Sequence, residues 1–243
     1  EVMKNQLDAP NKLYQSYLQA LMEWDRRKAE IEGSAEQAGT LRYYEAQLNY
    51  IANLLPGELA IARSQRSNIA RKLHACVAAV RDIYAELFAP VQQLIADTLV
   101  IKEGFKLTFA STIIQRGFRR DFFERFVSQG VNGSFCGKEL REKRLNDILE
   151  DIDFNDAESA ITFAERIEDQ LNTDFRSSKK YPMQVATQLR KHTTTKEFYD
   201  FLWSFDYIVP EYSLKLDGKD LSQLSPGERG ALLLVFYLLV ERS

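Results

Sequence analysis

The residues best suited to chemistry lie near the end of the sequence, in a serine-proline-glycine-glutamate run. Ser225 can cap a helix with its hydroxyl, Pro226 suits the first helical position, and Glu228 completes a capping box. Capping does not explain Gly227, because a glycine within the first turn costs about 1 kcal/mol relative to alanine. A glycine there is useful where a ligand must approach the backbone closely. Free N–H groups and the positive end of a helix dipole, beside a serine hydroxyl, are suited to a phosphate.

The same run also has a purely structural interpretation. Capping boxes are common, and ten apolar residues follow at 231–240, so Ser225 and Glu228 could simply begin a buried core helix. That apolar run is too short to span a bilayer. Gly227 favours the phosphate site over the plain helix cap, and both interpretations remain open at this point.

Residues 224–228, Leu-Ser-Pro-Gly-Glu, resemble the signature motif of ABC-type ATPases. The form is that of the SMC-like and DNA-repair branch, with proline where many members have glycine. The flanking segments 216–221 and 231–239 fit that branch too. The resemblance covers roughly residues 100–243, while the residues before it fit only the general plan of a family that inserts a coiled coil between two ATPase lobes.

Two further segments, 114–118 and 133–137, resemble the TrlF-like group of bacterial ATPases. That group is often linked to PHP-type phosphoesterase domains and to phage defence. The resemblance therefore implies a role in DNA repair or phage defence, with an associated nuclease or other effector, or nucleic acid, as a partner.

The resemblance also implies which residues meet the nucleotide. In this family Ser225 and Gly227 would contact the γ-phosphate of ATP held by the P-loop of a second ATPase protomer, and Glu228 belongs to the same cofactor-binding run. The implied cofactor is ATP, with Mg²⁺ held by parts of the site that lie outside this chain. The implied partner is a second protomer, most simply a second copy in a homo-oligomeric dimer, and no membrane partner is expected.

A complete ATPase needs a P-loop that holds the phosphates and a later acidic strand for magnesium and water. The nearest candidate, 133–139, has three residues between its glycines where four are required, and Glu139 stands where a hydroxyl should bind Mg²⁺. We reject it as a P-loop. The sequence therefore predicts no catalytic and no metal-binding residues, and the chain alone is not expected to hydrolyse ATP.

The elements that would position this motif follow from hydrophobic periodicity. In residues 1–102, apolar side chains recur at alternating three- and four-residue steps, which is typical of coiled-coil seams. Three seams are present: Tyr14, Tyr17, Leu21, Trp24 and Ile31; Leu41, Tyr44, Leu48, Ile51 and Leu55; Ile69, Leu73, Cys76, Val80, Ile83 and Leu87. They predict three antiparallel helices. The first break is Gly33 and Ser34, with Ser34 and Gln37 as a capping box, the second is Pro56 and Gly57, and the third helix ends at Pro90. A short helical bundle is the alternative, since no seam lasts three or four heptads.

Residues 103–243 have a mixed pattern. Alternation predicts a strand through Phe105, Leu107, Phe109 and Ile113, and another through Tyr212, Leu214 and Leu216 that ends in a turn at Asp217 and Gly218. Helices are expected around Phe118, Phe122 and Phe126, over 140–152, over 161–171, and after a capping box of Thr194 and Glu197. The predicted fold class is α+β: a helical coiled-coil or bundle region, 1–102, then a mainly helical ABC-ATPase lobe two with a small sheet, 103–243, which ends in the signature helix.

Composition limits the other functions. A net charge of -3 gives no overall basic field for nucleic acid or a membrane surface. Two local basic clusters could contact nucleic acid, although a solvated helix face for the first and acidic neighbours for the second favour ordinary surface residues: Arg116, Arg119, Arg120 and Arg125; Arg176, Lys179, Lys180, Arg190 and Lys191.

Two cysteines, Cys76 and Cys136, and two histidines, His74 and His192, have neither disulfide nor zinc spacing, so a cytoplasmic location is expected. The alternatives to an ATPase part are a non-enzymatic helical interaction module and a nucleic-acid-binding adaptor.

Overall fold

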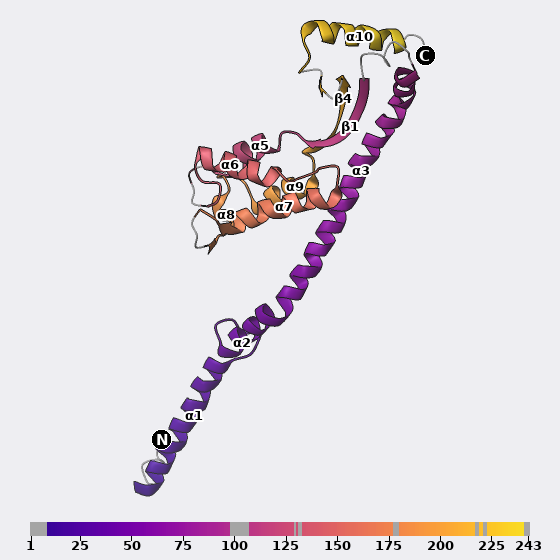
Figure 1. Cartoon of the computed structure of the whole chain (residues 1–243). Helices are drawn as coiled ribbons and strands as arrows, with labels where there is room; N and C mark the ends of the chain where they lie inside the picture. The colour runs from indigo at the N-terminus through magenta and orange to yellow at the C-terminus, as the bar shows by residue number, and fades with distance from the viewer. Residues whose placement is uncertain are drawn as a thin grey trace. The chain divides into compact units, whose positions relative to one another are not determined.

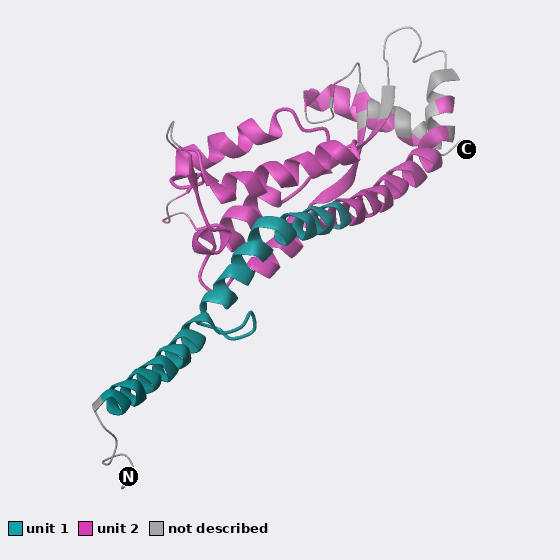
Figure 2. Ribbon diagram, turned by 90° about the horizontal axis from the view of Figure 1, so that it is seen from below, with its two compact units in different colours: residues 1–65 teal, residues 66–243 magenta. Residues whose placement is uncertain are grey.

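The structure is a computed structural model of the chain (Figure 1). It describes residues 9–97, 107–128, 130, 133–176, 180–216, 219–220 and 223–240. Contacts divide the chain into two compact units, Glu1–Gln65 and Arg66–Ser243 (Figure 2). The boundary expected at 102/103 lies outside the described residues. The fold is mostly helical with a small antiparallel sheet, which confirms the α+β class.

Unit 1 contains α1 (Ala9–Glu32), α2 (Leu41–Asn49), the π-helix η2 (Tyr50–Leu54) and the start of α3 (Leu55–Asp97). Gly33 ends α1 in a left-handed conformation, with φ of +53°. A side chain there would collide with Thr40, so only glycine fits this position.

Ser34 and Gln37 do not cap the second helix, which is a correction to the sequence analysis. Residues 33–40 form turns instead, and the Thr40 hydroxyl donates to the carbonyl oxygens of Ser34 (3.1 Å) and Gln37 (2.8 Å). Thr40 is the residue before α2 and is buried, so the helix starts where this turn is closed rather than at the first serine.

The two proline breaks predicted within residues 1–102 are also wrong. Pro56 and Gly57 lie within the first turn of α3, which directly follows η2. A proline ring normally collides with the carbonyl four residues back, and the wider π turn displaces that carbonyl. Pro90 likewise lies inside α3, which continues to Asp97, because a proline removes one hydrogen bond and bends a helix without having to end it.

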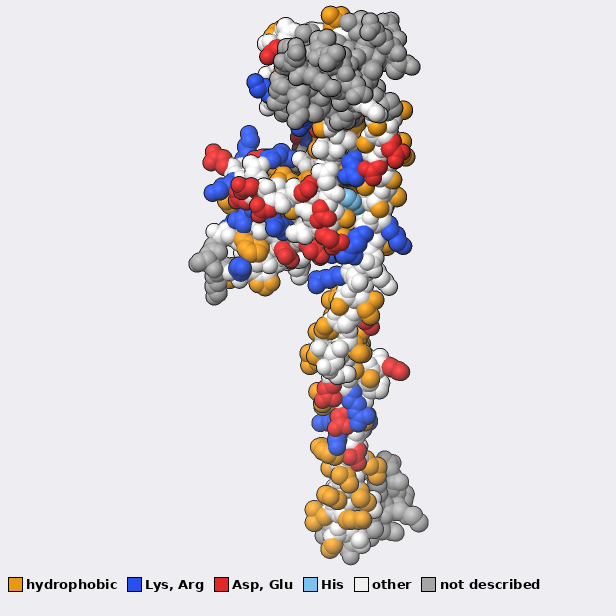
Figure 3. Space-filling model, turned by 45° about the vertical axis from the view of Figure 1, so that its right-hand side comes forward, with side chains coloured by type: hydrophobic (Ala, Val, Ile, Leu, Met, Phe, Trp, Pro, Cys, Tyr) orange, Lys and Arg blue, Asp and Glu red, His pale blue; other side chains and the backbone are white. Residues whose placement is uncertain are grey.

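The seam side chains of α1 and α2 face solvent. Exposed fractions along the α1 seam run from 41% at Leu21 to 68% at Ile31, and Tyr44 and Leu48 of α2 are 57% and 67% exposed. Hydrophobic side chains are visible on the surface of these helices in Figure 3. Among the described residues of unit 1, the helices therefore do not pair along their seams, and the antiparallel arrangement predicted from the sequence is not formed there.

Unit 2 holds the sheet, whose strand order is β1-β4-β5. Strand β1 (Leu107–Gln115) pairs antiparallel with β4 (Ile208–Leu216), so that Leu107 lies opposite Leu216 and Gln115 opposite Ile208. Strand β5 (Lys219–Asp220) adds a short third strand beside β4, and β2 (Thr173–Asp174) pairs with β3 (Tyr181–Pro182) in a separate two-stranded sheet. Phe105 and the turn at Asp217 and Gly218, both parts of the predicted strands, lie outside the described residues.

The helices of unit 2, besides α3, are α5 (Phe118–Asp121), the π-helix η3 (Phe122–Phe126), α6 (Lys138–Leu149), α7 (Ala157–Asn172), α8 (Val185–Gln188), α9 (Thr195–Ser204) and α10 (Pro226–Val240). Thr194 and Glu197 form the predicted capping box at α9. The helix expected over 140–152 ends at Leu149, and the one expected from Ile161 begins at Ala157, because the Asp156 side chain accepts a hydrogen bond from the Ser159 N–H.

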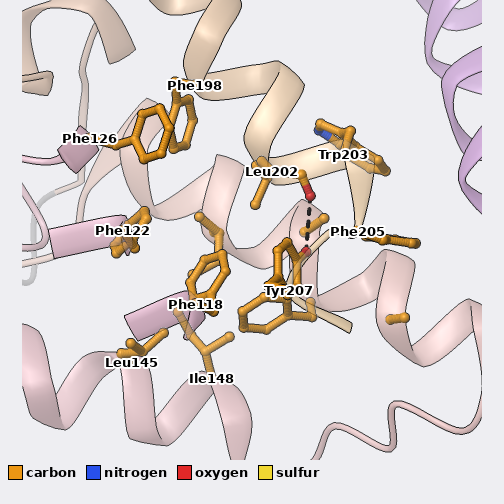
Figure 4. Close-up of a cluster of buried hydrophobic side chains, with 14 of the residues drawn as sticks. Phe118, Phe122, Phe126, Leu145, Ile148, Phe198, Leu202, Trp203, Phe205 and Tyr207 are labelled. Carbon is orange, nitrogen blue, oxygen red and sulfur yellow. Dashed lines mark hydrogen bonds between the residues drawn. The ribbon is translucent and has the colours of Figure 1, made fainter. Parts of the chain in front are cut away.

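An aromatic cluster forms the core of unit 2 (Figure 4). Phe118 is fully buried and stacks on Phe122 with ring centroids 5.2 Å apart, while the Phe163 ring meets it edge-on at 4.8 Å. The hydroxyl of buried Tyr207 donates to the Leu202 carbonyl oxygen over 3.0 Å. Such aromatic pairs contribute about 0.5–1.5 kcal/mol each beyond the area they bury.

Helix α3 packs on this core through a different face from the predicted seam. Its buried positions include Ala70 and His74, and His74 Nε2 lies 2.9 Å from the Phe154 carbonyl oxygen. The predicted seam faces solvent, with Ile69, Ile83 and Leu87 all more than half exposed. Small side chains such as Ala70 let the helix approach the core closely, which larger apolar residues would prevent.

Candidate functional site

The run singled out in the sequence lies at the start of α10. The Ser225 N–H donates to the Glu228 carboxylate over 2.7 Å, and the Glu228 N–H donates to the Ser225 hydroxyl oxygen over 3.3 Å. These reciprocal bonds are a capping box. The Arg229 side chain also donates through Nε to the carbonyl oxygen of buried Leu224 over 2.9 Å. The capping box and the Arg229 side chain therefore both link the residues before α10 to its first turn.

Gly227 has open space around it. A Cβ at this position would meet no atom of the described residues within 4 Å, and Ser225, Gly227 and Glu228 are all exposed. Internal packing thus gives no reason for a glycine here. Its N–H lies in the first helical turn, where the helix itself provides no acceptor. The Gly227 N–H could donate to an anion from outside, and the Ser225 hydroxyl could do so once its hydrogen turns away from the Glu228 carboxylate.

Glu228 has a different role. Hydrogen bonds from the Ser225 backbone N–H and then from its side chain, with the positive charge of Lys219, hold the pKa of the Glu228 carboxyl below its usual range. The carboxylate is therefore ionised at neutral pH, and it would repel a phosphate. The geometry makes Glu228 the partner that orients Ser225, while Ser225 and Gly227 carry the donors.

The first basic cluster is neutralised by neighbouring carboxylates. Arg116 pairs with Glu211 (3.2 Å), Arg119 with Glu142, and both Arg120 (3.0 Å) and Arg125 (3.9 Å) with Asp121. Each guanidinium thus has an acid beside it, as expected for a solvated protein surface rather than a nucleic-acid contact.

The second basic cluster is dispersed. Arg176 pairs with Asp174 over 2.7 Å, Lys180 lies over the Phe175 ring at 5.0 Å, and Arg190 donates to the Phe123 carbonyl oxygen over 2.8 Å. Lys179 lies outside the described residues. These contacts do not form a continuous basic surface for a phosphate backbone.

The rejected P-loop candidate serves the core. The Ser134 hydroxyl donates to the Thr173 carbonyl oxygen over 2.7 Å and accepts from the Phe175 N–H over 3.0 Å. Ser134 and Phe135 are both buried, and a side chain at Gly133 would collide with Gln188. This loop therefore anchors the ends of neighbouring elements instead of presenting its N–H groups to a ligand.

The remaining candidates form no site together. Both cysteines are free thiols, and no group of three or more metal-binding side chains occurs among the described residues. No helix in the described part of the chain combines the length and the apolar character needed to cross a membrane.

Unit 2 also contains a cavity of about 490 Å³ that the sequence analysis did not predict. Its lining includes Arg116, Arg125 and His192 from the candidates above, together with carboxylates and aromatic rings. The one local signal was the density of Phe and Tyr around α9, which periodicity alone assigns to the core.

Comparison with protein-family models, with curated proteins and with solved structures finds no match for this chain. The local geometry at the start of α10 and in the cavity therefore carries the functional interpretation.

Proposed function

We propose that the chain is part of an SMC-like ABC ATPase, acting in DNA repair or phage defence, and that it supplies the signature motif that closes on ATP bound by a partner protomer. Residues 103–243 would then form lobe two and residues 1–102 the coiled-coil region. The observation that carries the proposal is the exposed start of α10, where a capping box presents Ser225 beside a glycine for which packing within the described residues gives no reason.

The residues fit a phosphate in kind and in position. When bound, ATP supplies the charged γ-phosphate, and the partner protomer's parts of the site hold its magnesium. Gly227 would donate its N–H to the phosphate oxygens, helped by the positive end of the α10 dipole, and Ser225 would donate its hydroxyl hydrogen after turning it away from Glu228. Glu228 keeps Ser225 in place through the bond from the Ser225 N–H.

The test is a bulky side chain at Gly227 in the full-length protein. We expect Gly227→Leu to leave the melting temperature nearly unchanged, because the position is open, and to abolish ATP-dependent pairing and turnover. Ser225→Ala should cost roughly 1 kcal/mol of stability through the lost cap and should also weaken pairing.

Gly230→Leu is the matched control, because Gly230 is equally exposed and open and lies in the same helix. It should pair and turn over normally. Normal turnover of Gly227→Leu, or an equal loss in both variants, would show that the run only caps a helix.

A second candidate function is a non-enzymatic helical interaction module. The observation that favours it is the exposed apolar seam of α1, where Tyr14, Tyr17 and Trp24 are each more than half exposed. Such a stripe is stable in water when a second helix covers it, and a second copy of this chain has the matching stripe. In this case ATP would have no effect on association.

A further inference from the structure

The cavity of unit 2 lies among η3, the turn that precedes α9, and α9 itself. Its volume, about 490 Å³, is within the range of small-ligand pockets, and every residue that lines it belongs to unit 2. The lining combines aromatic rings with four carboxylates and two guanidinium groups: Phe126, Phe201, Tyr207; Asp121, Glu197, Asp200, Asp206; Arg116, Arg125.

The aromatic rings form one face of the cavity. Phe126 and Phe201 are stacked with centroids 4.5 Å apart and planes 19° apart, and the Tyr207 ring lies 5.7 Å from Phe201. The guanidinium carbon of Arg125 already lies 5.2 Å from the centre of the Phe126 ring. Phe201 also stacks on Phe118 with centroids 5.4 Å apart, and its side chain is half-buried, so a cation would contact the part of the ring that these neighbours leave open.

The charges of the lining also favour a cation. Both guanidinium groups already have a carboxylate partner. Arg116 pairs with Glu211 at 3.2 Å, and Arg125 pairs with Asp121 at 3.9 Å. This leaves the acidic side chains in excess over the cationic ones in the lining. An anion entering here would meet that excess of negative charge, whereas a cation would be attracted by it.

Three carboxylates remain for a ligand. Glu197 is ionised, since hydrogen bonds from the backbone N–H and then the side chain of Thr194 hold its pKa below the usual range. Asp200 pairs with Lys196, and both of these side chains are largely exposed, so water weakens the pair. Asp206 forms no ion pair with any cation of the described residues.

Backbone strain occurs at the same place. His192 and Phe205 are the non-glycine residues with left-handed φ in the described part of the chain, at 75° and 59°. His192 lines the cavity, and Phe205 stands between Ser204 and Asp206, which also line it. At Phe205 this conformation is the left-handed cap that ends α9, and at His192 it lies in the turn that leads into α9.

We propose that this cavity binds an alkylammonium or guanidinium group, held between Asp200 and Asp206 and against the ring of Phe201. The group would belong either to a free polyamine or to a lysine or arginine side chain of a peptide. The site lies apart from the start of α10 in sequence, and the proposal stands or falls independently of ATP.

Titration calorimetry of the full chain tests this, with spermidine and a short lysine- and arginine-containing peptide as separate probes and pyrophosphate as the anionic control. We expect at least one cationic probe to bind, and Asp206→Asn to weaken that binding by about tenfold. Phe201→Leu should weaken it by several-fold through the lost ring face. Binding of spermidine alone identifies a small polyamine, and binding of the peptide alone identifies a basic protein segment.

Asp151→Asn is the matched control, because it makes the same charge change on an exposed side chain outside the cavity. It should leave binding unchanged, and the melting temperatures of Asp151→Asn and Asp206→Asn should agree with that of the parent, whereas Phe201→Leu also loses ring contacts with the core and should melt lower. The proposal is overturned if neither cationic probe binds at millimolar concentration, if pyrophosphate binds in their place, or if Asp151→Asn weakens binding as much as Asp206→Asn.

Discussion

Asn155 joins the loop before α7 to the sheet through a single side chain. Its Oδ1 accepts from the N–H of Ile113 over 2.9 Å, and its Nδ2 donates to Asp153 over 2.9 Å. Ile113 is 2% exposed, so its N–H has no access to water as a substitute partner. Asn155→Ala should therefore destabilise the protein by about 1–3 kcal/mol at neutral pH, measured by urea unfolding.

The loss should depend on pH. Hydrogen bonds from the Asn155 backbone N–H and then its side chain hold the pKa of Asp153 below its usual range. A folded-state pKa below the unfolded value adds stability above the unfolded pKa, and that stability is lost as pH falls through the folded pKa. The difference between Asn155→Ala and the parent should shrink on acidification below about pH 4. A difference that stays constant down to pH 2 would rule out the Asp153 contribution.

Single residues were more predictable from the sequence where their partners are near in the chain. The boxes of Thr194 with Glu197 and Ser225 with Glu228 span three residues each, and both form. The box of Ser34 with Gln37 has the same spacing and does not form, because the turn closed by Thr40 moves the start of α2. The bond between Asn155 and Ile113 spans 42 residues, so no local pattern signals it. The same holds for the cavity, whose lining comes from segments that only tertiary packing brings together.

At the scale of elements, the exposed seam of α1 leads to a test of self-association. If a second copy covers this seam, Leu21→Lys should weaken dimerisation by tenfold or more, since burying a leucine contributes about 1.5–3 kcal/mol. Sedimentation equilibrium of the full chain measures this. Met22→Lys, at an exposed position off the seam, should have little effect. Equal behaviour of the two variants, or a chain that is monomeric throughout, would remove the seam as an interface.

Periodicity predicted the existence of most elements, but it was a poorer guide to where each element ends and which of its faces is buried. Proline and glycine are good signals for a break in an ordinary α-helix, but the π turn η2 allows Pro56 to follow without one. On α3, the predicted seam and the buried face are neighbouring faces of the same helix. Hydrophobic periodicity selects the face with the larger apolar side chains as the buried one, whereas the structure buries the face that contains Ala70. Which face packs is decided by the shape of the core, which periodicity does not contain.

For the whole molecule, the core is confined to one unit. Every buried apolar residue among those described belongs to Arg66–Ser243, and in Glu1–Gln65 the buried side chain is that of Thr40. A fragment of residues 66–243 should therefore fold cooperatively, with a urea midpoint close to that of the full chain. Near-UV circular dichroism and urea unfolding measure this. A fragment without fixed aromatic signals would show that the first 65 residues are needed for folding.

This division at Gln65 and Arg66 was not visible in the sequence, where the change of pattern occurs after about residue 102. The reason is that α3 is one helix whose later part binds the core. Arg66 lies over the Trp203 ring at 3.8 Å and pairs with Glu168 at 2.8 Å, and Arg71 bonds to Glu158, 87 residues away. Such long-range contacts, and not the hydrophobic pattern, set the unit boundary.

The edges of the sheet have a consequence for aggregation. Because the Arg116 N–H bonds to the Tyr207 carbonyl oxygen, the alternation of the ladder directs the N–H of Ile113 and the nitrogen of Pro210, which lie opposite each other, away from the shared pairing. Asn155 already occupies the first of these outward positions, and proline has no hydrogen to offer at the second. Each strand thus lacks one free donor on the side that faces away from the other, at Ile113 of β1 and at Pro210 of β4, which makes it a poorer template for a strand from another molecule that could begin a fibril.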